Sequence, residues 1–357
     1  MKGTVGTVRR VGLIGAGGIV QKTHAVGYRA LEGRVAVTAL ADPSESNRDA
    51  AGTLLRIAPE HRYTDYRDML AHAPIDTVVI ATPHSFHKEQ AIAAAEAGKA
   101  VISEKPMAIT LEEAAAILSA VKRHGVAYTV VHNLLFSQAV RGAAHLLKEL
   151  GRPLLGRGEM LGNKSEATTT IEKDWRASKR YGGGALIDSS YHEIYTVETL
   201  MGSPVKYVSA RIATLKFPID VDDTALMTYE HENGAASTVH AAWHTRGPAH
   251  RGRWVSINGT RGAIRVVYAD PAPLSRYKDA PEGSNRWETV DAGELPGIPA
   301  AIEGDGTGHA AFLVAAFEAL ANGGPMPITG AQALHNLAIV DAACRSSDER
   351  RGIEVQA

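Results

Sequence analysis

The sequence has little cysteine, no excess of either charge and no long apolar run. Cys344 is its single cysteine, so a disulfide framework within the chain and a cysteine-based zinc site are both excluded. The 38 Lys and Arg residues nearly balance the 39 Asp and Glu residues, which predicts neither a nucleic-acid surface nor an acidic tail. No apolar stretch approaches the roughly 20 residues that span a bilayer. We therefore expect no nucleic-acid or membrane partner.

The N-terminal region also lacks the features of a secretory signal. Arg9 and Arg10 precede the apolar run VGLIGAGGIV, but glycines interrupt this run and no small-residue cleavage pattern follows it. The single cysteine agrees with a reducing compartment. The expected location is the cytoplasm.

The residues that are abundant favour a two-domain α/β protein. Hydrophobic residues make up 45% of the 357 positions, enough for a sizeable core. At roughly 150 residues per domain, this length suggests two domains. The first part of the chain alternates short Val- and Ile-rich runs with helical stretches, as βαβ units of a doubly wound parallel sheet do. The predicted strands are Val8–Ile14, Val35–Ala41, Thr77–Ala81, Ala100–Ser103 and Val126–Val131, and the clearest helices are Glu89–Ala97 and Leu111–His124.

This alternation stops near residue 131, which divides the chain into a first domain (1–131) and a second domain (132–357). Asn233-Gly234 is a hairpin signal between two later strands, so the second domain is predicted to be α+β with a large, mostly antiparallel open sheet. An exposed apolar face of that sheet favours a homodimer or homotetramer. The predicted helices are Gln138–Leu150, Ala185–Met201, Ala310–Ala321 and Ala331–Ser346, and the strands are Leu155–Gly162, Val205–Leu215, Thr224–His231, Ala235–His244, Arg253–Asn258 and Ala263–Tyr268.

A glycine-rich turn follows the first predicted strand. Gly15 permits a tight turn, Gly17 lets a pyrophosphate approach the backbone, and the next helix offers free N–H groups. Val20 replaces the third glycine of the G-x-G-x-x-G pattern, which predicts looser packing of helix on strand. Asp42 ends the next strand, where an acid accepts from the adenosine ribose hydroxyls. The pattern predicts a Rossmann domain that binds NAD in preference to NADP, because the acid would repel a 2′-phosphate. Arg48 is close in the sequence and weakens this preference. The alternative is a glycine-rich turn that binds no cofactor.

Two further motifs carry candidate catalytic groups. Lys105 follows a predicted strand at the carboxyl edge of the sheet, where it can stabilise charge on a substrate oxygen or simply be a solvated lysine. Asp188 and His192 follow three glycines and are four residues apart on a predicted helix, hence on one face. A histidine beside a carboxylate can exchange protons near neutral pH. The alternative is a helix-end acid and a packed histidine.

These segments together resemble the glucose–fructose oxidoreductase, inositol dehydrogenase and rhizopine catabolism (Gfo/Idh/MocA) family. The similarity runs almost end to end through GAGGIVQKTH, ALADP, VVIATPHSFHKEQAIAAAEAGKAVISEKPMA, DWRASKRYGGGALIDSSYHEIYTVETLMG and VDDTALMTYEHENGAASTVHAAW. It implies a Rossmann domain, a second domain with a large open sheet, and hydride transfer between a nicotinamide and a secondary hydroxyl of a sugar, polyol or glycoside. Lys105, Asp188 and His192 fall on the family's catalytic positions.

The resemblance also implies roles for these residues. His192 would remove the hydroxyl proton, Lys105 would hold the same oxygen, and Asp188 would orient His192 or the sugar. An aromatic ring suits the C–H face of a sugar and Arg donates to hydroxyls, so Trp175 and Arg176 are candidate sugar contacts; core packing is the alternative for Trp175. The expected substrate-binding residues are Lys105, Asn133, Trp175, Arg176, Asp188 and His192.

The cofactor contacts implied for this chain come from the glycine turn and from the ends of later strands. Many family members carry Asn at the position of His84 and Arg at the position of Leu135, so the contacts of those side chains do not transfer. His87 matches a position that is usually His in the family, with a structural role at a helix N-terminus as the alternative. The expected contacts are Gly15, Gly17, Gly18, Ile19, Asp42, Thr82, Pro83, His84, His87, Glu104 and Lys105.

Several functions stay open at this point. The main hypothesis is a sugar or polyol dehydrogenase. The alternatives are an NAD-using glycosidase that oxidises its substrate transiently, a 3-keto-sugar-forming glycoside dehydrogenase, and a cofactor-binding regulatory protein without turnover. His231, His240 and His244 could form a metal cluster, but a sheet-surface or interface role is favoured and no metal is expected. Asp222-Asp223 is interpreted as a turn or a pocket wall.

Overall fold

The structure is a computed structural model that describes residues 8–246, 252–268, 273–278 and 286–356. It contains two structural units, and the polypeptide passes from one to the other three times. The first unit comprises Met1–Asn133 and Ile302–Ala333, and the second comprises Leu134–Ala301 and Leu334–Ala357. The first crossing lies close to the expected boundary at residue 131. Residues 302–333, which the sequence pattern places in the second domain, instead belong to the first unit.

The first unit is built on a six-stranded parallel sheet in the order β3-β2-β1-β4-β5-β6. This confirms the predicted doubly wound Rossmann arrangement. The strand order reverses between β1 and β4, and ligands of such sheets bind outside the carboxyl ends of the strands at this point. The strands are β1 (Arg9–Ile14), β2 (Val35–Ala41), β3 (Arg62–Tyr63), β4 (Thr77–Ile80), β5 (Ala100–Ser103) and β6 (Tyr128–Val130).

Helices flank this sheet, and local sequence sets their ends. The predicted capping box of α5 is confirmed: the Glu113 N–H donates to Thr110 Oγ1 at 3.2 Å, and the Ile109 N–H donates to Glu113 Oε2 at 3.2 Å. The helices are α1 (Ala25–Ala30), α2 (Glu45–Leu54), α3 (Tyr66–His72), α4 (His87–Glu96), α5 (Leu111–His124) and α8 (His309–Asn322).

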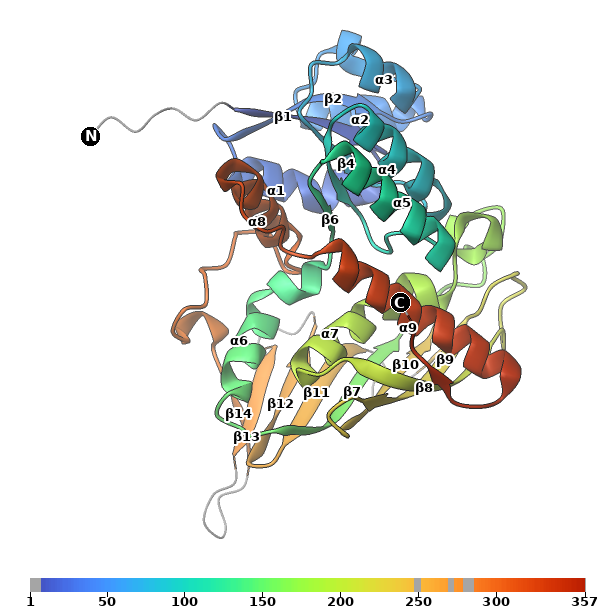
Figure 1. Ribbon diagram of the computed structural model, residues 1–357, viewed down its shortest axis with the longest axis vertical. Helices are drawn as coiled ribbons and strands as arrows, with labels where there is room; N and C mark the ends of the chain where they lie inside the picture. The colour runs from blue at the N-terminus through green and yellow to red at the C-terminus, as the bar shows by residue number, and fades with distance from the viewer. Residues whose placement is uncertain (1–7, 247–251, 269–272, 279–285, 357) are drawn as a thin grey trace. The chain divides into compact units, whose positions relative to one another are not determined.

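Helix α8 explains why residues 302–333 return to the first unit. Its buried apolar residues include Phe312, Leu313 and Phe317, and the helix packs on α1 (Figure 1). Further along, the Thr129 hydroxyl of β6 donates to the Ile328 carbonyl at 2.8 Å. Burial of this apolar face holds a segment that is distant in sequence against the Rossmann sheet.

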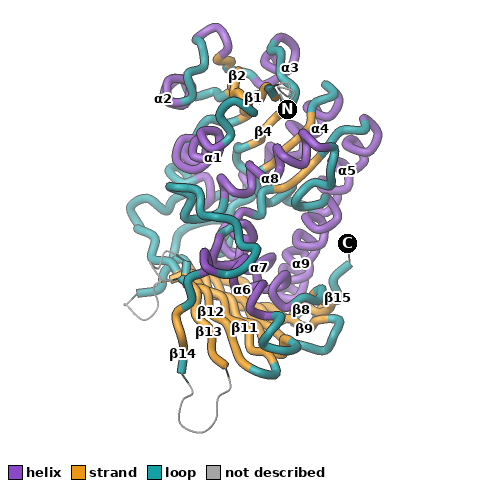
Figure 2. Tube along the Cα trace, turned by 90° about the vertical axis from the view of Figure 1, so that its left-hand side faces the viewer, coloured by secondary structure: helices purple, strands orange, loops and turns teal. Residues whose placement is uncertain are grey.

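The second unit contains a nine-stranded sheet in the order β14-β13-β12-β11-β7-β10-β9-β8-β15. Among the described strands of this sheet only β7 and β10 pair in parallel, which confirms the expected mostly antiparallel sheet. Figure 2 shows β8, β9, β11, β12, β13 and β14 in orange. The strands are β7 (Pro153–Leu161), β8 (Val205–Ala213), β9 (Thr224–His231), β10 (Ala236–Ala242), β11 (Gly252–Gly259), β12 (Gly262–Val267), β13 (Leu274–Lys278), β14 (Trp287–Thr289) and β15 (Ile353–Glu354).

One face of this sheet is covered by α6 (Gln138–Leu147), α7 (Tyr191–Met201) and α9 (Gly330–Glu349), which share a buried core with it (Figure 1). Buried and exposed side chains alternate along β9, so its residues point to the two faces of the sheet in turn. Met227 and Tyr229 are buried in this core, whereas Leu226 on the opposite face is 47% exposed. On the open face the row that contains Leu226 continues through His240, Glu159 and Trp254. This row holds two large apolar side chains and two ionisable ones, so the described part of the open face is apolar only in part.

Candidate active site

The glycine turn closes tightly against the sheet. Gly15 has φ +90°, and a Cβ at this position would lie 2.5 Å from the Ala81 carbonyl oxygen, so only glycine fits here. A Cβ on Gly17 or Gly18 would meet nothing within 4 Å, so the backbone there faces open space. Val20 is fully buried, and the helix takes a π-helical turn over Val20–His24 before α1. The predicted loose packing around Val20 is not seen.

Asp42 lies at the end of β2 and contacts this turn directly. Its Oδ2 accepts a hydrogen bond from the Ala16 N–H at 2.8 Å, and its Oδ1 accepts from the Ser44 N–H at 2.9 Å. The guanidinium of Arg48 donates to the Asp42 carbonyl at 2.7 Å. The first unit thus brings the predicted acid and the glycine turn together, with Arg48 close beside them.

The segment after β4 is held by a buried histidine. His87 is inaccessible to solvent, and its two ring nitrogens lie 2.8 Å from the Pro106 carbonyl and 3.0 Å from the Thr82 carbonyl. Burial lowers the pKa of His87. These contacts join the loops after β4 and β5, and His84, 3% exposed, lies against His87 with ring centroids 5.8 Å apart.

Glu104 and Lys105 directly follow β5 and are both almost buried. His24 Nε2 lies 2.7 Å from Glu104 Oε1, and His309 Nε2 lies 3.9 Å from the same oxygen. Burial would raise the pKa of Glu104, but the hydrogen bond from His24 and the charges of His24, His309 and Lys105 outweigh burial and lower it to about 2. Burial lowers the pKa of His309 to about 4. The residue before the candidate lysine is therefore a buried carboxylate that His24 holds by a hydrogen bond, with His309 close by.

Sequence reasoning missed His24 and His309 as partners of Glu104. His24 ends the GAGGIVQKTH segment of the family resemblance, but neither histidine stands near Glu104 in the chain. Asn133 contacts residues 302–333, the later segment of the first unit, because its Nδ2 donates to the Thr307 carbonyl at 2.7 Å.

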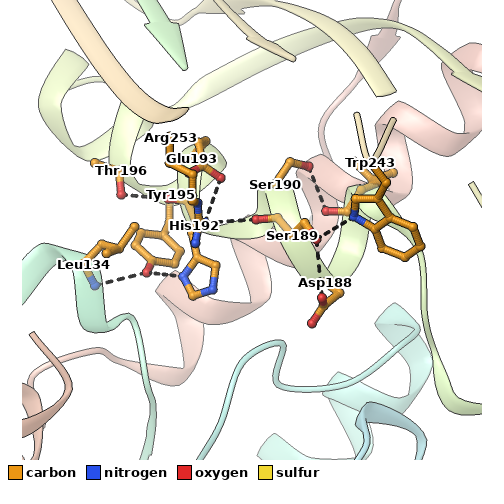
Figure 3. Close-up of polar contacts among 11 residues, drawn as sticks. Leu134, Asp188, Ser189, Ser190, His192, Glu193, Tyr195, Thr196, Trp243 and Arg253 are labelled. Carbon is orange, nitrogen blue, oxygen red and sulfur yellow. Dashed lines mark hydrogen bonds and ion pairs between the residues drawn. The ribbon is translucent and has the colours of Figure 1, made fainter. Parts of the chain in front are cut away.

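In the second unit the glycines before the segment that carries Asp188 and His192 allow close backbone approach. A Cβ on Gly183 would overlap the Arg176 carbonyl, and the Gly184 N–H donates to that carbonyl at 3.0 Å. The segment Ala185–Ser190 is π-helical and leads into α7, so Asp188 and His192 are not separated by a regular α-helical turn. Both side chains nevertheless project to the same side of the segment in Figure 3.

Asp188 is paired with a predicted sugar contact. The Arg176 Nε lies 3.2 Å from Asp188 Oδ2, and the Arg176 guanidinium lies over the Trp175 ring at 4.4 Å from its centroid. The Ser189 hydroxyl donates to Asp188 at 3.4 Å and accepts from the Trp243 indole at 2.9 Å (Figure 3). The second unit thus brings Trp175, Arg176 and Asp188 together.

His192 contacts a tyrosine that sequence reasoning missed. Its Nδ1 lies 2.8 Å from the Tyr195 hydroxyl, and the hydroxyl oxygen accepts from the Leu134 N–H at 3.2 Å (Figure 3). On the same helix, the buried Glu193 carboxylate accepts from Arg253 of β11 at 2.9 and 3.2 Å. The i, i+3 spacing could have identified Tyr195, whereas no local signal connects Arg253 with this helix.

The three histidines considered for a metal lie in separate surroundings. His231 contacts the Ser203 carbonyl and the Ser237 hydroxyl, His240 pairs with Glu159 at 3.2 Å, and His244 contacts the Thr224 hydroxyl. Within the described ranges, no three His, Cys, Asp or Glu residues are grouped as metal ligands would be. No described helix is long and apolar enough to cross a membrane.

Two family models match the chain. Residues 9–132 match an oxidoreductase family with an NAD-binding Rossmann fold (GFO_IDH_MocA), and residues 142–265 match the GFO/IDH/MocA C-terminal domain. The two matches fall within the two structural units.

The chain is also similar to characterised proteins over its whole length. It is 31% identical to the levoglucosan dehydrogenase of Pseudarthrobacter phenanthrenivorans over 97% of both chains. It is 27% identical to the D-apiose dehydrogenase of Paraburkholderia graminis over 99% of this chain and 92% of that one. A structure of levoglucosan dehydrogenase with NADH and levoglucosan superposes with a TM-score of 0.86 at 28% identity, covering 98% of this chain and all of the other.

Proposed function

Because the chain belongs to the GFO/IDH/MocA oxidoreductase family, we propose that it is an NAD(P)-dependent dehydrogenase acting on a secondary hydroxyl of a sugar or polyol. The observation that carries this proposal is the similarity to levoglucosan dehydrogenase over 97% of both chains, through both units. Levoglucosan and D-apiose dehydrogenases suggest a compact, neutral sugar or anhydrosugar as the substrate.

The first unit suits a nicotinamide dinucleotide. The open space beside Gly17 and Gly18 leaves room for a pyrophosphate, and Asp42 stands beside the turn to meet the ribose hydroxyls. The Asp42 carboxylate would repel a 2′-phosphate, so we propose NAD in preference to NADP. The bound cofactor supplies the hydride acceptor. The proposed contacts are Gly15, Gly17, Gly18, Ile19, Asp42, Thr82, Pro83, His84, His87, Glu104 and Lys105.

The proposed mechanism assigns one task to each catalytic side chain. The Lys105 ammonium donates to the substrate oxygen and stabilises its developing negative charge. His192 takes the hydroxyl proton at Nε2, since its Nδ1 is engaged by Tyr195. Asp188 and Arg176, joined at 3.2 Å, offer an acceptor and donors to neighbouring hydroxyls. Trp175 and Asn133 are proposed as further substrate contacts.

A cofactor-reduction assay tests the proposal. Levoglucosan, D-apiose and scyllo-inositol are offered with NAD⁺ and NADP⁺, and NADH or NADPH is followed at 340 nm. We expect reduction with at least one sugar, and a loss of roughly 10²–10⁴ in kcat for His192→Gln. His145→Gln, on α6, is the matched control and should retain the wild-type rate. Full kcat in His192→Gln contradicts the assigned base, and cleavage of a glycoside without net redox change contradicts the dehydrogenase.

Self-association is proposed through the open face of the nine-stranded sheet. This face carries Leu226, 47% exposed, in one row with His240 and Glu159, whose Nδ1 and Oε1 atoms lie 3.2 Å apart. A second copy would cover the apolar area and keep the pair intact, giving a homodimer or a tetramer built from it. Light scattering of the wild type should show an oligomer that Leu226→Asp weakens; a wild-type monomer contradicts the proposal. The single cysteine supports our further proposal of a cytoplasmic location.

A further inference from the structure

Tyr195 lies on the same face of α7 as the proposed base, three residues after it. Its hydroxyl oxygen is 2.8 Å from His192 Nδ1 and 3.2 Å from the Leu134 backbone nitrogen. A backbone N–H can only donate, so the Tyr195 oxygen is an acceptor toward Leu134. The tyrosine is 1% exposed and joins the histidine to a backbone position 61 residues earlier in the chain.

The surroundings hold the tyrosine ring in place and keep its hydroxyl neutral. Tyr191 packs against it edge-on, with ring centroids 6.1 Å apart at 71°. The charged groups near it are Glu193 and Arg253, which pair with each other at 2.9 and 3.2 Å. Burial raises the pKa of Tyr195 well above its ordinary value. The phenol therefore stays protonated and meets His192 as a neutral hydroxyl.

A histidine that acts as a base must present one nitrogen without a proton. The partner of the other nitrogen decides which one that is. We propose that Tyr195 is a positioning residue whose oxygen accepts hydrogen bonds from both the Leu134 N–H and the His192 Nδ1–H, leaving His192 Nε2 to take and return the substrate proton. This inference rests on the proposed role of His192 as the base.

This arrangement serves both states of the catalytic cycle. Nδ1 carries a proton in the neutral form with bare Nε2 and also in the imidazolium form, so the same hydrogen bond persists through both. The oxygen of a neutral tyrosine can accept as well as donate, and in this arrangement it accepts from Leu134 and from His192. The hydroxyl need not reorient during turnover, and the imidazole keeps its orientation while the proton moves at Nε2.

Tyr195→Phe removes only the hydroxyl, and Tyr229→Phe is a matched control. Tyr229 is also a buried tyrosine of the second unit, with its hydroxyl on the Met227 sulfur at 3.0 Å. The full chain is labelled with ¹⁵N-histidine, and the His192 ring signals are assigned by their loss in His192→Gln. In the wild type and in Tyr229→Phe, the neutral ring should show a pyrrole-like Nδ1 and an imine-like Nε2. In Tyr195→Phe, the two signals should shift toward a mixture of tautomers.

Steady-state kinetics provide the second readout. Without its acceptor the imidazolium is less stable, so the pKa of the base falls and the acidic limb of the kcat profile moves to lower pH. We expect kcat to fall roughly 10–100-fold, the loss typical when the hydrogen-bond partners of metal-binding histidines are removed. KM should change little because Tyr195 is buried, at 1% exposure, and offers no surface to a substrate.

The two proposals fail in different ways. An imine-like Nδ1 in the wild type, or no change of tautomer in Tyr195→Phe, overturns the role of Tyr195 whatever the activity. A changed tautomer with an unchanged kcat and pH profile supports the contact with Tyr195 and overturns the role of His192 as the base.

Discussion

The carboxylate of Asp222 fills the space that a side chain on Gly184 would occupy. Gly184 has φ +124°, and a Cβ placed there would overlap Asp222 Oδ1. Asp222 Oδ2 accepts from the Leu186 N–H at 2.7 Å, and its carbonyl accepts from the Ala185 N–H at 2.9 Å. Asp222 thus caps the segment that carries Asp188. These contacts give Asp222 a structural role beyond its interpretation as a turn or pocket wall.

Gly184→Ala should destabilise the protein. The added Cβ meets the Asp222 carboxylate in a backbone conformation that L side chains rarely adopt, so we expect a loss of about 1–3 kcal/mol in the free energy of unfolding. Urea unfolding at pH 7 measures it. Gly162→Ala is the control, because its Cβ would find ordinary contacts at 3.6 Å, and it should change stability by no more than about 0.5 kcal/mol. Equal effects of the two substitutions would contradict the close fit.

Asp222→Asn should flatten the dependence of stability on pH. Burial raises the pKa of Asp222 from 3.8 to about 7 in the folded state. The folded protein therefore holds a proton that the unfolded chain releases, and stability falls as pH rises from about 4 to about 7. The variant lacks this pH-dependent contribution to the free energy of unfolding. Its stability relative to the wild type should therefore be greater at pH 8 than at pH 5. A constant difference across these pH values would show that Asp222 titrates normally.

Glu104→Gln should destabilise the first unit, mostly at neutral pH. The folded-state pKa of about 2 means that ionised Glu104 stabilises the fold above about pH 4.5 and loses this effect as pH falls toward 2. We expect a loss of about 1–3 kcal/mol at pH 7, since the buried His24 loses its charged partner, and a smaller loss at pH 4. Urea unfolding at both pH values measures the two losses. Glu318→Gln, which breaks an exposed pair with Arg34, should cost less than about 1 kcal/mol at either pH.

Asp42→Ser should shift cofactor preference toward NADP. Removal of the carboxylate beside the glycine turn abolishes repulsion of a 2′-phosphate, and Arg48 remains nearby to attract it. The ratio of kcat/KM for NADP⁺ over NAD⁺ should rise by about tenfold or more, equivalent to about 1.4 kcal/mol. The control is Asp49→Ser, an exposed acid on α2 that pairs with Arg62, and it should leave the ratio unchanged. A ratio unaffected by Asp42→Ser would remove Asp42 from cofactor selection.

Much of the fold follows from local patterns in the sequence. Strand β2 and helix α5 have the predicted limits, and the Asn233-Gly234 hairpin joins β9 to β10 as expected. These elements depend on alternation, capping and turn residues that lie within a few positions of one another. Strands β3 and β15 have only two residues each, too few to show a period, and they were missed.

The sequence by itself determined the glycine turn with its acid, the strand-end position of Lys105 and the helix that carries Asp188 and His192. These features depend on neighbouring residues and on the direction of parallel strands. Only the tertiary structure decided that His24 and His309 lie beside Glu104, that Tyr195 joins His192 to Leu134, and that Asp222 fits against Gly184. It also returned residues 302–333 to the first unit. These contacts join segments that are far apart in the chain, or side chains whose directions depend on packing. Local sequence patterns do not specify which distant residues will pack together.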